Sequence, residues 1–228
     1  MPSNNSIEVA GQEIPLWPEG QELHALDEKG VFLRTDFADH ALYADDLRTA
    51  VEAQLADPTV QSQYSRALGG TKIYRLENWE SPAAQLVNAR ALEAYKRAVK
   101  SESGVIDMAW ANVYGTGDYV GPHSHIRSNA SVVYMLDEGD LDPQDRYSGL
   151  FAIIDPRFPP CCKVASGYMT NPFSPKLKGG SMIVFPSSLV HCVYPYGGKR
   201  QRITFAWNIT QEALEDDTLT LLNQGTVE

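Results

Sequence analysis

The sequence predicts one domain of mixed class, mainly β with α, in which short strands form a sandwich or jelly roll. Apolar residues in the first half of the chain recur at helical spacing, whereas from residue 105 they recur at every second position. The later segments are short, aromatic and β-branched, and Gly, Pro, Asp and Asn separate them. A chain of 228 residues, 43% of them hydrophobic, is large enough to bury one substantial core.

Two amphipathic helices are expected in the first half. The first lies in ADHALYADDLRTAVEAQLADP (38–58), which halts at Pro58. The second lies in SPAAQLVNARALEAYKRAVK (81–100), with Ser81 as N-cap and Pro82 as first helical residue. Their apolar stripes are Leu47, Val51 and Leu55 in the first helix, and Val87, Ala91, Tyr95 and Val99 in the second.

Strands are expected before the helices at VFLRTDF and TKIYRL, and a series of strands follows residue 105. The later ones are IDMAWANVY, ASVVYML, LFAII, SMIVFP, HCVYPY and RITFAWNI. Residues 137–149 and 156–180 are rich in Pro, Gly and Asp, and we expect them to be long loops of the kind that contact substrates.

The last strand has two different faces. Strand alternation puts Ile203, Phe205, Trp207 and Ile209 on one face and Arg202, Thr204, Ala206 and Asn208 on the other. The polar face either meets water, as in many antiparallel sheets, or lines a cavity.

Charge and cysteine content narrow the range of partners. With 19 basic and 29 acidic side chains the net charge is −10, which disfavours nucleic acid and anionic membranes and is compatible with a small-molecule substrate. The N-terminus is polar and no apolar run approaches the ~20 residues of a membrane span. The three cysteines, Cys161, Cys162 and Cys192, make a poor disulfide framework, so we expect a cytoplasmic protein. Nothing in the sequence indicates the oligomeric state.

A histidine pair stands out in GPHSHIRSN (121–129). His123 and His125 are two residues apart, so an extended backbone points both to the same side, and His191 follows far downstream. Two near ligands and one distant ligand would hold a metal between two strands, and imidazole suits Zn, Cu, Fe and Ni. Alternatively the pair lies exposed on a turn and His191 is unrelated. His24 and His40 are expected to be surface or core histidines.

Arg202 adds a further feature, since it follows His191 by eleven positions with Thr204 on the same face. At these residues the sequence resembles the iron(II)- and 2-oxoglutarate-dependent oxygenases, whose pattern is His-x-Asp/Glu, a distal His and then Arg, often as Arg-x-Ser/Thr. The resemblance extends over roughly residues 105–210. It is carried by WANVYGTGDYVGPHSH, SVVYML, FAIIDPR, GGSMIVFPSSLVHCVYPY and RITFAWNI, in that order.

The resemblance implies a double-stranded β-helix, a cupin-like jelly roll with helices packed on one sheet, mostly from the N-terminal half. Within a single domain 1–228, residues 1–104 would support a catalytic core at 105–210, and 211–228 would form a tail. His123 and His191 would be iron ligands. Arg202 and Thr204 would bind the distal carboxylate of 2-oxoglutarate, because a guanidinium fork fits a carboxylate. Further contacts to cosubstrate or substrate are assigned to Asn112 and Tyr134.

His125 departs from the pattern, because the superfamily has Asp or Glu there. It is either the third ligand, a group beside a water ligand, or replaced by another carboxylate such as Asp118; we favour the ligand role. Three neutral imidazoles would leave the Fe(II) unit with charge +2, which the 2-oxoglutarate dianion would neutralise.

The function that this resemblance implies is a non-haem Fe(II) dioxygenase that uses O2 and 2-oxoglutarate. It would hydroxylate a small molecule or amino-acid-like substrate and convert 2-oxoglutarate to succinate. Substrate contacts would come from loop residues Tyr147, Arg157 and Tyr168. The alternatives are a three-histidine cupin-type dioxygenase that does not use 2-oxoglutarate, and a non-catalytic metal-binding cupin-like module. Neither needs a carboxylate clamp at Arg202 and Thr204.

Overall fold

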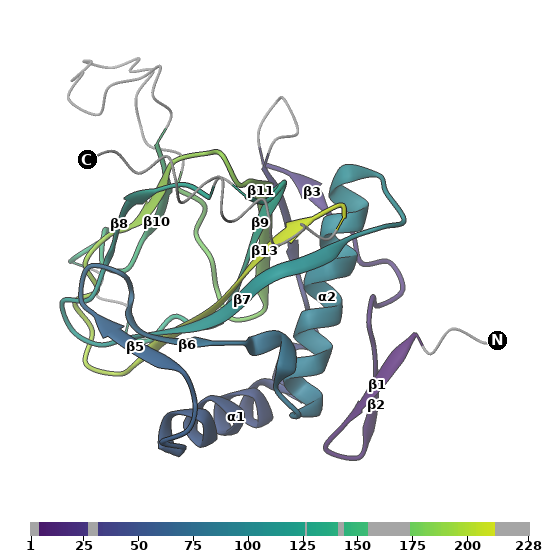
Figure 1. The fold of residues 1–228 in the computed structure, drawn as a ribbon, viewed down its shortest axis with the longest axis horizontal. Coiled ribbons are helices and arrows are strands. Elements are labelled where there is room, and N and C mark those ends of the chain that lie inside the picture. Colours follow the sequence, from purple (N-terminus) through teal and green to yellow (C-terminus); the bar gives the residue numbers. More distant parts are fainter. Residues whose placement is uncertain (1–4, 27–31, 126, 141–143, 155–173, 213–228) are drawn as a thin grey trace.

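The computed structural model describes residues 5–26, 32–125, 127–140, 144–154 and 174–212, and these form three layers (Figure 1). Two helices cover the outer face of a large antiparallel sheet, and a smaller antiparallel sheet lies against its inner face. This is the double-stranded β-helix arrangement that the sequence led us to expect, and both helices come from the N-terminal half.

The large sheet has eight strands, and the small sheet has three. In spatial order the large sheet contains β3 (His24–Ala25), β4 (Leu33–Asp36), β11 (Ser181–Pro186), β9 (Ala130–Asp137), β13 (Arg202–Thr210), β7 (Val105–Tyr114), β6 (Gly70–Tyr74) and β5 (Ser62–Ser65). The small sheet contains β10 (Phe151–Ile153), β12 (His191–Val193) and β8 (Val120–His123). Four strands of the large sheet thus come from the first 104 residues, so this segment contributes to the sheet as well as to the helices.

The helices form where the local signals predict them. They are α1 (Ala44–Ala56) and α2 (Pro82–Val99), and two short 3₁₀ turns, η1 (His40–Leu42) and η2 (Leu76–Asn78), precede them. The Ser81 side chain caps α2 by accepting a hydrogen bond from the Ala84 backbone N–H at 3.4 Å. Leu55 and Val99, the last members of the two stripes, are exposed because each lies in the final turn of its helix. No helix in the described ranges is long and apolar enough to span a membrane.

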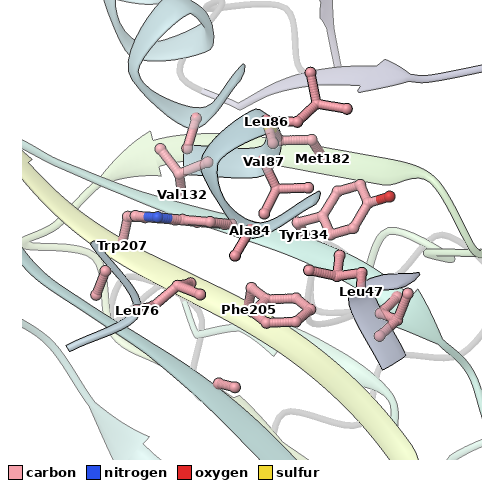
Figure 2. Packing of buried hydrophobic residues seen from close by; sticks show 14 of the residues in the cluster. Leu47, Leu76, Ala84, Leu86, Val87, Val132, Tyr134, Met182, Phe205 and Trp207 are labelled. Atoms are coloured by element: carbon pink, nitrogen blue, oxygen red, sulfur yellow. The ribbon is translucent and has the colours of Figure 1, made fainter. Parts of the chain in front are cut away.

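The main core lies between the helices and the large sheet (Figure 2). Phe205 and Trp207 of β13 face α2, where the Trp207 indole N–H donates to the Asn88 side-chain oxygen at 2.7 Å. Every residue of β13 is buried, including those of its polar face. The possibility that this face meets water is therefore wrong, because the small sheet covers it and encloses a cavity.

Some elements carry weak sequence signals and were not expected. The hairpin of β1 (Ser6–Val9) and β2 (Gln12–Pro15) turns at Ala10 and Gly11, which both have positive φ, as a tight two-residue hairpin loop requires. Strands β5 and β8 are short and lack an apolar alternation. Most of the expected loop 156–180 lies outside the described residues.

Candidate metal centre

Three histidines meet in the cavity between the two sheets. His123 ends β8 and His191 begins β12, and the two residues are direct partners in the antiparallel pairing. His125 follows β8 and is held by a backbone hydrogen bond to the Ser187 carbonyl at 2.8 Å. The ligand atoms of all three lie within 4.8 Å of one another. The structure therefore brings together the three residues that the sequence nominated.

Backbone contacts select one tautomer in two of the three rings. Nδ1 of His123 lies 2.9 Å from the Gly121 carbonyl oxygen, and Nδ1 of His191 lies 2.9 Å from that of Leu189. A carbonyl oxygen only accepts, so each Nδ1 must carry the proton and donate. Each Nε2 is left with a free lone pair, which is the form that binds a metal ion.

The environment also keeps these rings neutral. Burial lowers the pKa of His191 to about 4, although the hydrogen bond to Leu189 opposes this. Burial, followed by repulsion from His191 and His123, lowers the pKa of His125 to about 3. Burial lowers the pKa of His123 as well. Because metal binding requires neutral imidazole, the group is ready for a cation at neutral pH.

The local sequence explains how the two strands present their histidines. Strand β8 lies at the edge of the small sheet, which is where Pro122 can occur without losing a ladder hydrogen bond. The His191 ring packs against Phe151 and Phe185, with ring centroids 5.8 and 5.0 Å away. These aromatic rings restrict the orientation of the imidazole.

Arg202 lies in the same cavity as a buried cation without a carboxylate partner among the described residues. It is 3% exposed, and in the described part of the chain its Nη1 has no hydrogen-bond partner and no carboxylate pairs with it. The guanidinium lies 4.7 Å from the Tyr114 ring centroid. Burial lowers the Arg202 pKa, although Tyr114 opposes the shift. A buried charge is costly unless it is paired, so this arrangement suits an anionic ligand.

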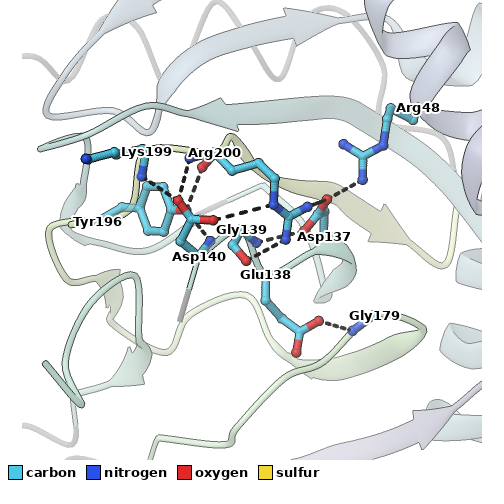
Figure 3. A network of polar contacts seen from close by, with 9 residues as sticks. All are labelled: Arg48, Asp137, Glu138, Gly139, Asp140, Gly179, Tyr196, Lys199 and Arg200. Atoms are coloured by element: carbon cyan, nitrogen blue, oxygen red, sulfur yellow. Dashed lines mark hydrogen bonds and ion pairs between the residues drawn. The ribbon is translucent and has the colours of Figure 1, made fainter. Parts of the chain in front are cut away.

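A polar network fixes the start of β13, and with it Arg202 (Figure 3). The Arg200 guanidinium donates to Asp137 at 2.6 Å and to the Gly139 carbonyl at 2.7 Å. The Tyr196 hydroxyl donates to the Arg200 carbonyl at 2.6 Å and accepts from the Asp140 N–H at 2.6 Å. The chain before Arg202 is therefore held from both sides.

Asn112 and Thr204 lie beside each other in the cavity. The Asn112 amide donates to the Thr204 hydroxyl at 3.3 Å, and its oxygen accepts from the Trp110 indole at 3.1 Å. Both residues line the cavity with Arg202, and their contacts to 2-oxoglutarate stay a prediction.

Tyr134 is not brought to this cavity. It lies on the helix side of β9, opposite Phe205, and its hydroxyl donates to that of Tyr43 at 2.9 Å and lies 2.6 Å from Nδ1 of His40. Apart from Ser131 the segment ASVVYML is almost entirely apolar, so its alternation alone does not reveal which of its faces meets the cavity.

The remaining nominated residues lie elsewhere. Tyr147 is 45% exposed and contacts Tyr194, with ring centroids 5.6 Å apart and the rings tilted by 41°. Arg157 and Tyr168 lie outside the described residues. Asp118 is buried and accepts from the Gly115 N–H at 2.7 Å, so it is occupied in its turn and does not join the histidines.

Sequence reasoning missed Lys72 and Trp110, which also line the cavity. Lys72 lies on β6 with its ammonium 5.0 Å from the Trp110 ring centroid. A lysine in a short strand is expected to point into water, so no signal in the sequence marks it. The Trp110 ring lies 5.8 Å from that of His125.

Comparison with known families agrees with this geometry. Residues 108–208 match the family model described as "Putative 2OG-Fe(II) oxygenase", the segment that holds the three histidines and Arg202. This segment of the chain is therefore similar to the Fe(II)- and 2-oxoglutarate-dependent oxygenases. The family uses Fe(II) and 2-oxoglutarate, and the tautomers at His123 and His191 and the unpaired Arg202 fit both groups. No curated protein matches the sequence.

Solved structures share the fold at low sequence identity. AviO1 from Streptomyces viridochromogenes Tue57 is 14% identical with a TM-score of 0.57, and the match covers 84% of this chain and 98% of AviO1. The epimerase SnoN from nogalamycin biosynthesis, in complex with Fe3+, alpha ketoglutarate and nogalamycin RO, is 11% identical with a TM-score of 0.61 and 87% coverage of each chain. A Pseudomonas putida prolyl-4-hydroxylase is 15% identical with a TM-score of 0.51, covering 80% of this chain and 89% of its own. At these identities the likeness establishes the fold.

Proposed function

We propose that this oxygenase hydroxylates a small, amino-acid-like molecule, using Fe(II), O2 and 2-oxoglutarate. The observation that carries the proposal is Arg202, a buried guanidinium without a carboxylate partner among the described residues, in the cavity that holds the three histidines. A three-histidine dioxygenase that does not use 2-oxoglutarate has no need for such a cation. A non-catalytic metal-binding module has no need for it either.

Each cavity residue has a role in this proposal. His123 and His191 hold the iron through Nε2, and His125 is the third ligand. The Arg202 fork and the Thr204 hydroxyl hold the distal carboxylate of 2-oxoglutarate, and Asn112 orients Thr204. When bound, Fe(II) supplies the oxygen-activating chemistry that couples hydroxylation to the conversion of 2-oxoglutarate to succinate and CO2.

Apolar side chains complete the proposed site. Val120, Val133, Phe151 and Val193 line the cavity around the polar groups. They exclude water, which strengthens the pairing between Arg202 and a carboxylate because the local dielectric is low.

The reaction type is the finer part of the proposal. The fold neighbours include a prolyl-4-hydroxylase and an epimerase, so the fold accommodates both outcomes. We favour hydroxylation and expect one succinate for each substrate hydroxylated. Mass spectrometry of the product distinguishes an added oxygen from an inverted centre.

Anaerobic titration of the Fe(II)-loaded protein with 2-oxoglutarate tests cosubstrate binding. We expect a saturable charge-transfer band in the visible range. Arg202→Ala should weaken 2-oxoglutarate binding by about 2–4 kcal/mol, or roughly 30- to 1000-fold, because it removes a charge-assisted pair. Arg97→Ala, on the exposed side of α2, is the matched control. Unchanged affinity in the Arg202 variant would remove the main support for the proposal.

Metal analysis tests the histidines independently. His191→Ala should lose bound iron, whereas His24→Ala, an exposed histidine, should keep it. Full iron stoichiometry in the His191 variant would place the metal elsewhere. For His125→Asp, retained iron with altered activity would fit a ligand role.

A further inference from the structure

A second cation in the cavity has no role in the proposed binding of iron or 2-oxoglutarate. Lys72 is partly buried, and no carboxylate lies within ion-pair distance of its ammonium in the ranges that the structure describes. Its nearest defined partner is the Trp110 ring, at 5.0 Å. Burial lowers the Lys72 pKa, which agrees with an ammonium that is largely removed from water.

Lys72 and Arg202 lie at separate places on the cavity wall. Lys72 is the direct cross-strand partner of Asn112, and Asn112 is the partner of Thr204. The three therefore form a row across β6, β7 and β13. Since neighbouring strands are about 4.8 Å apart, the Lys72 backbone is about 10 Å from that of Thr204. A ligand clamped by Arg202 and Thr204 would leave Lys72 on the far side of Asn112.

Trp110 gives the Lys72 side of the cavity a fixed wall. Its indole N–H is bonded to the Asn112 oxygen, so the ring cannot turn freely. The ring centroid lies 5.8 Å from that of His125 and 5.0 Å from the Lys72 ammonium. A group bound at Lys72 would thus lie next to Trp110, close to the candidate metal ligands.

The excess of positive charge in the cavity favours binding of a further anion besides 2-oxoglutarate. None of the residues that line it in the described structure is Asp or Glu, whereas Lys72 and Arg202 are both cationic. With His125 in place of a carboxylate, the metal keeps charge +2, and the 2-oxoglutarate dianion offsets only that amount. Two positive charges would remain in a low-dielectric space, although the whole chain carries −10.

We propose that Lys72, beside Trp110, binds a carboxylate of the substrate and so selects acidic small molecules. This inference rests on the proposed function, since it assigns the substrate of the same site. The net charge of −10, taken alone, would disfavour an acidic substrate. The local charge decides, because screening limits the influence of distant surface charges to about 8–10 Å.

Binding of matched acids and amides tests the proposal. The probes are 3-phenylpropionate, indole-3-acetate and N-acetylphenylalanine, each beside its primary amide. They are titrated into iron-loaded protein saturated with 2-oxoglutarate, without O2, so that Arg202 is already occupied. We expect wild type to bind at least one acid about tenfold more tightly than its amide, as a charge-assisted contact implies. Lys72→Met should abolish the preference, and Lys72→Arg should retain it.

Two controls separate the possible failures. Lys96→Met, in the last turn of α2 and away from the cavity, should leave the acid preference intact. The 2-oxoglutarate band is recorded in every variant, and its absence in wild type would defeat the proposed function itself. If wild type shows the 2-oxoglutarate band but does not prefer acids over amides, only the Lys72 inference is overturned. The same holds if the band is normal and no probe binds. A Lys72→Met variant that loses 2-oxoglutarate affinity would also overturn it, because Lys72 would then bind the cosubstrate.

Discussion

Arg90 and Arg202 are both buried, on opposite sides of the same sheet, yet their surroundings differ completely. Arg90 of α2 is 0% exposed and donates to both oxygens of Asp39, at 2.9 and 2.6 Å. It also donates to the Tyr43 hydroxyl at 2.9 Å and to the carbonyls of Pro15 and Leu16 at 2.8 and 3.1 Å. Arg202 has no carboxylate partner among the described residues, and its Nη1 lacks any partner there.

The pKa values of the two guanidinium groups move in opposite directions. Burial alone would lower the pKa of Arg90, but the hydrogen bonds to Asp39, together with the charge interactions with Tyr43 and Asp39, outweigh it and raise the pKa. At Arg202 burial dominates and the pKa falls. Burial of an arginine therefore does not by itself indicate function. What distinguishes the functional candidate is that no carboxylate of the described residues pairs with it, whereas on the helix side every donor of the Arg90 guanidinium is satisfied.

The largest expected effect is on the helix side. Asp39→Ala should lower the free energy of unfolding by about 3–5 kcal/mol, because it leaves the buried Arg90 charge unpaired. Urea unfolding measures this. Glu93→Ala removes the exposed pair with Arg97 and should cost about 0.5 kcal/mol. Equal effects of the two substitutions would refute the view that Arg90 is compensated by Asp39.

The free energy of unfolding should depend on pH through the histidines of the cavity. In metal-free protein the folded-state pKa of His191 is about 4, below the value of about 6.5 in the unfolded chain. The unfolded chain therefore binds more protons between these values, so the free energy of unfolding falls as the pH is lowered from 6.5 to 4. His191 alone should account for about 3 kcal/mol. Unfolding of wild type and His191→Asn across this range checks the slope, and identical slopes would contradict the prediction.

Gly149 links backbone conformation to the position of Arg202. Its φ is +61°, and an added Cβ would lie 2.9 Å from Cδ of Arg202. Gly149→Ala should cost about 1–2 kcal/mol of stability and also weaken 2-oxoglutarate binding. Gly20→Ala is the control, since Gly20 has φ +74° with nothing within 4 Å of the added Cβ. Gly20→Ala should lower the stability but leave 2-oxoglutarate affinity unchanged. If both variants weakened 2-oxoglutarate binding to a similar extent, the effect would not act through Arg202.

Tyr134 tests whether the two sides act independently. Tyr134→Phe removes the hydroxyl bonded to Tyr43 and should lower the free energy of unfolding by about 1 kcal/mol. Since this hydroxyl lies on the helix side, the 2-oxoglutarate titration should not change. A weaker cosubstrate affinity would restore the role that the sequence suggested for Tyr134.

The smallest effect on stability is expected at Arg202 itself. Arg202→Met should leave the free energy of unfolding unchanged or raise it, because an uncompensated buried charge is replaced by an apolar chain of similar length. Thermal and urea unfolding of the ligand-free protein measure this. A loss as large as that of Asp39→Ala would mean that Arg202 is structurally paired, and the contrast between the two arginines would disappear.

The sequence by itself determined the features that depend on one element. Helix α2 begins at its Ser81 cap, and the alternation of β13 separates Phe205 and Trp207 from Arg202 and Thr204. The His-x-His spacing and the interval from His191 to Arg202 were also readable, because both follow from chain order and backbone geometry.

Only the tertiary structure decided what lies across from these residues. The pairing of β8 with β12 puts His123 opposite His191, and the row across β6, β7 and β13 puts Lys72 beside the cavity. The side of β9 on which Tyr134 lies likewise depends on neighbouring elements. So does the lack of a carboxylate partner for Arg202 within the described part of the chain. Local pattern sets the direction of a side chain relative to its own strand. The register between strands sets what that side chain meets, and contacts between distant segments determine this register.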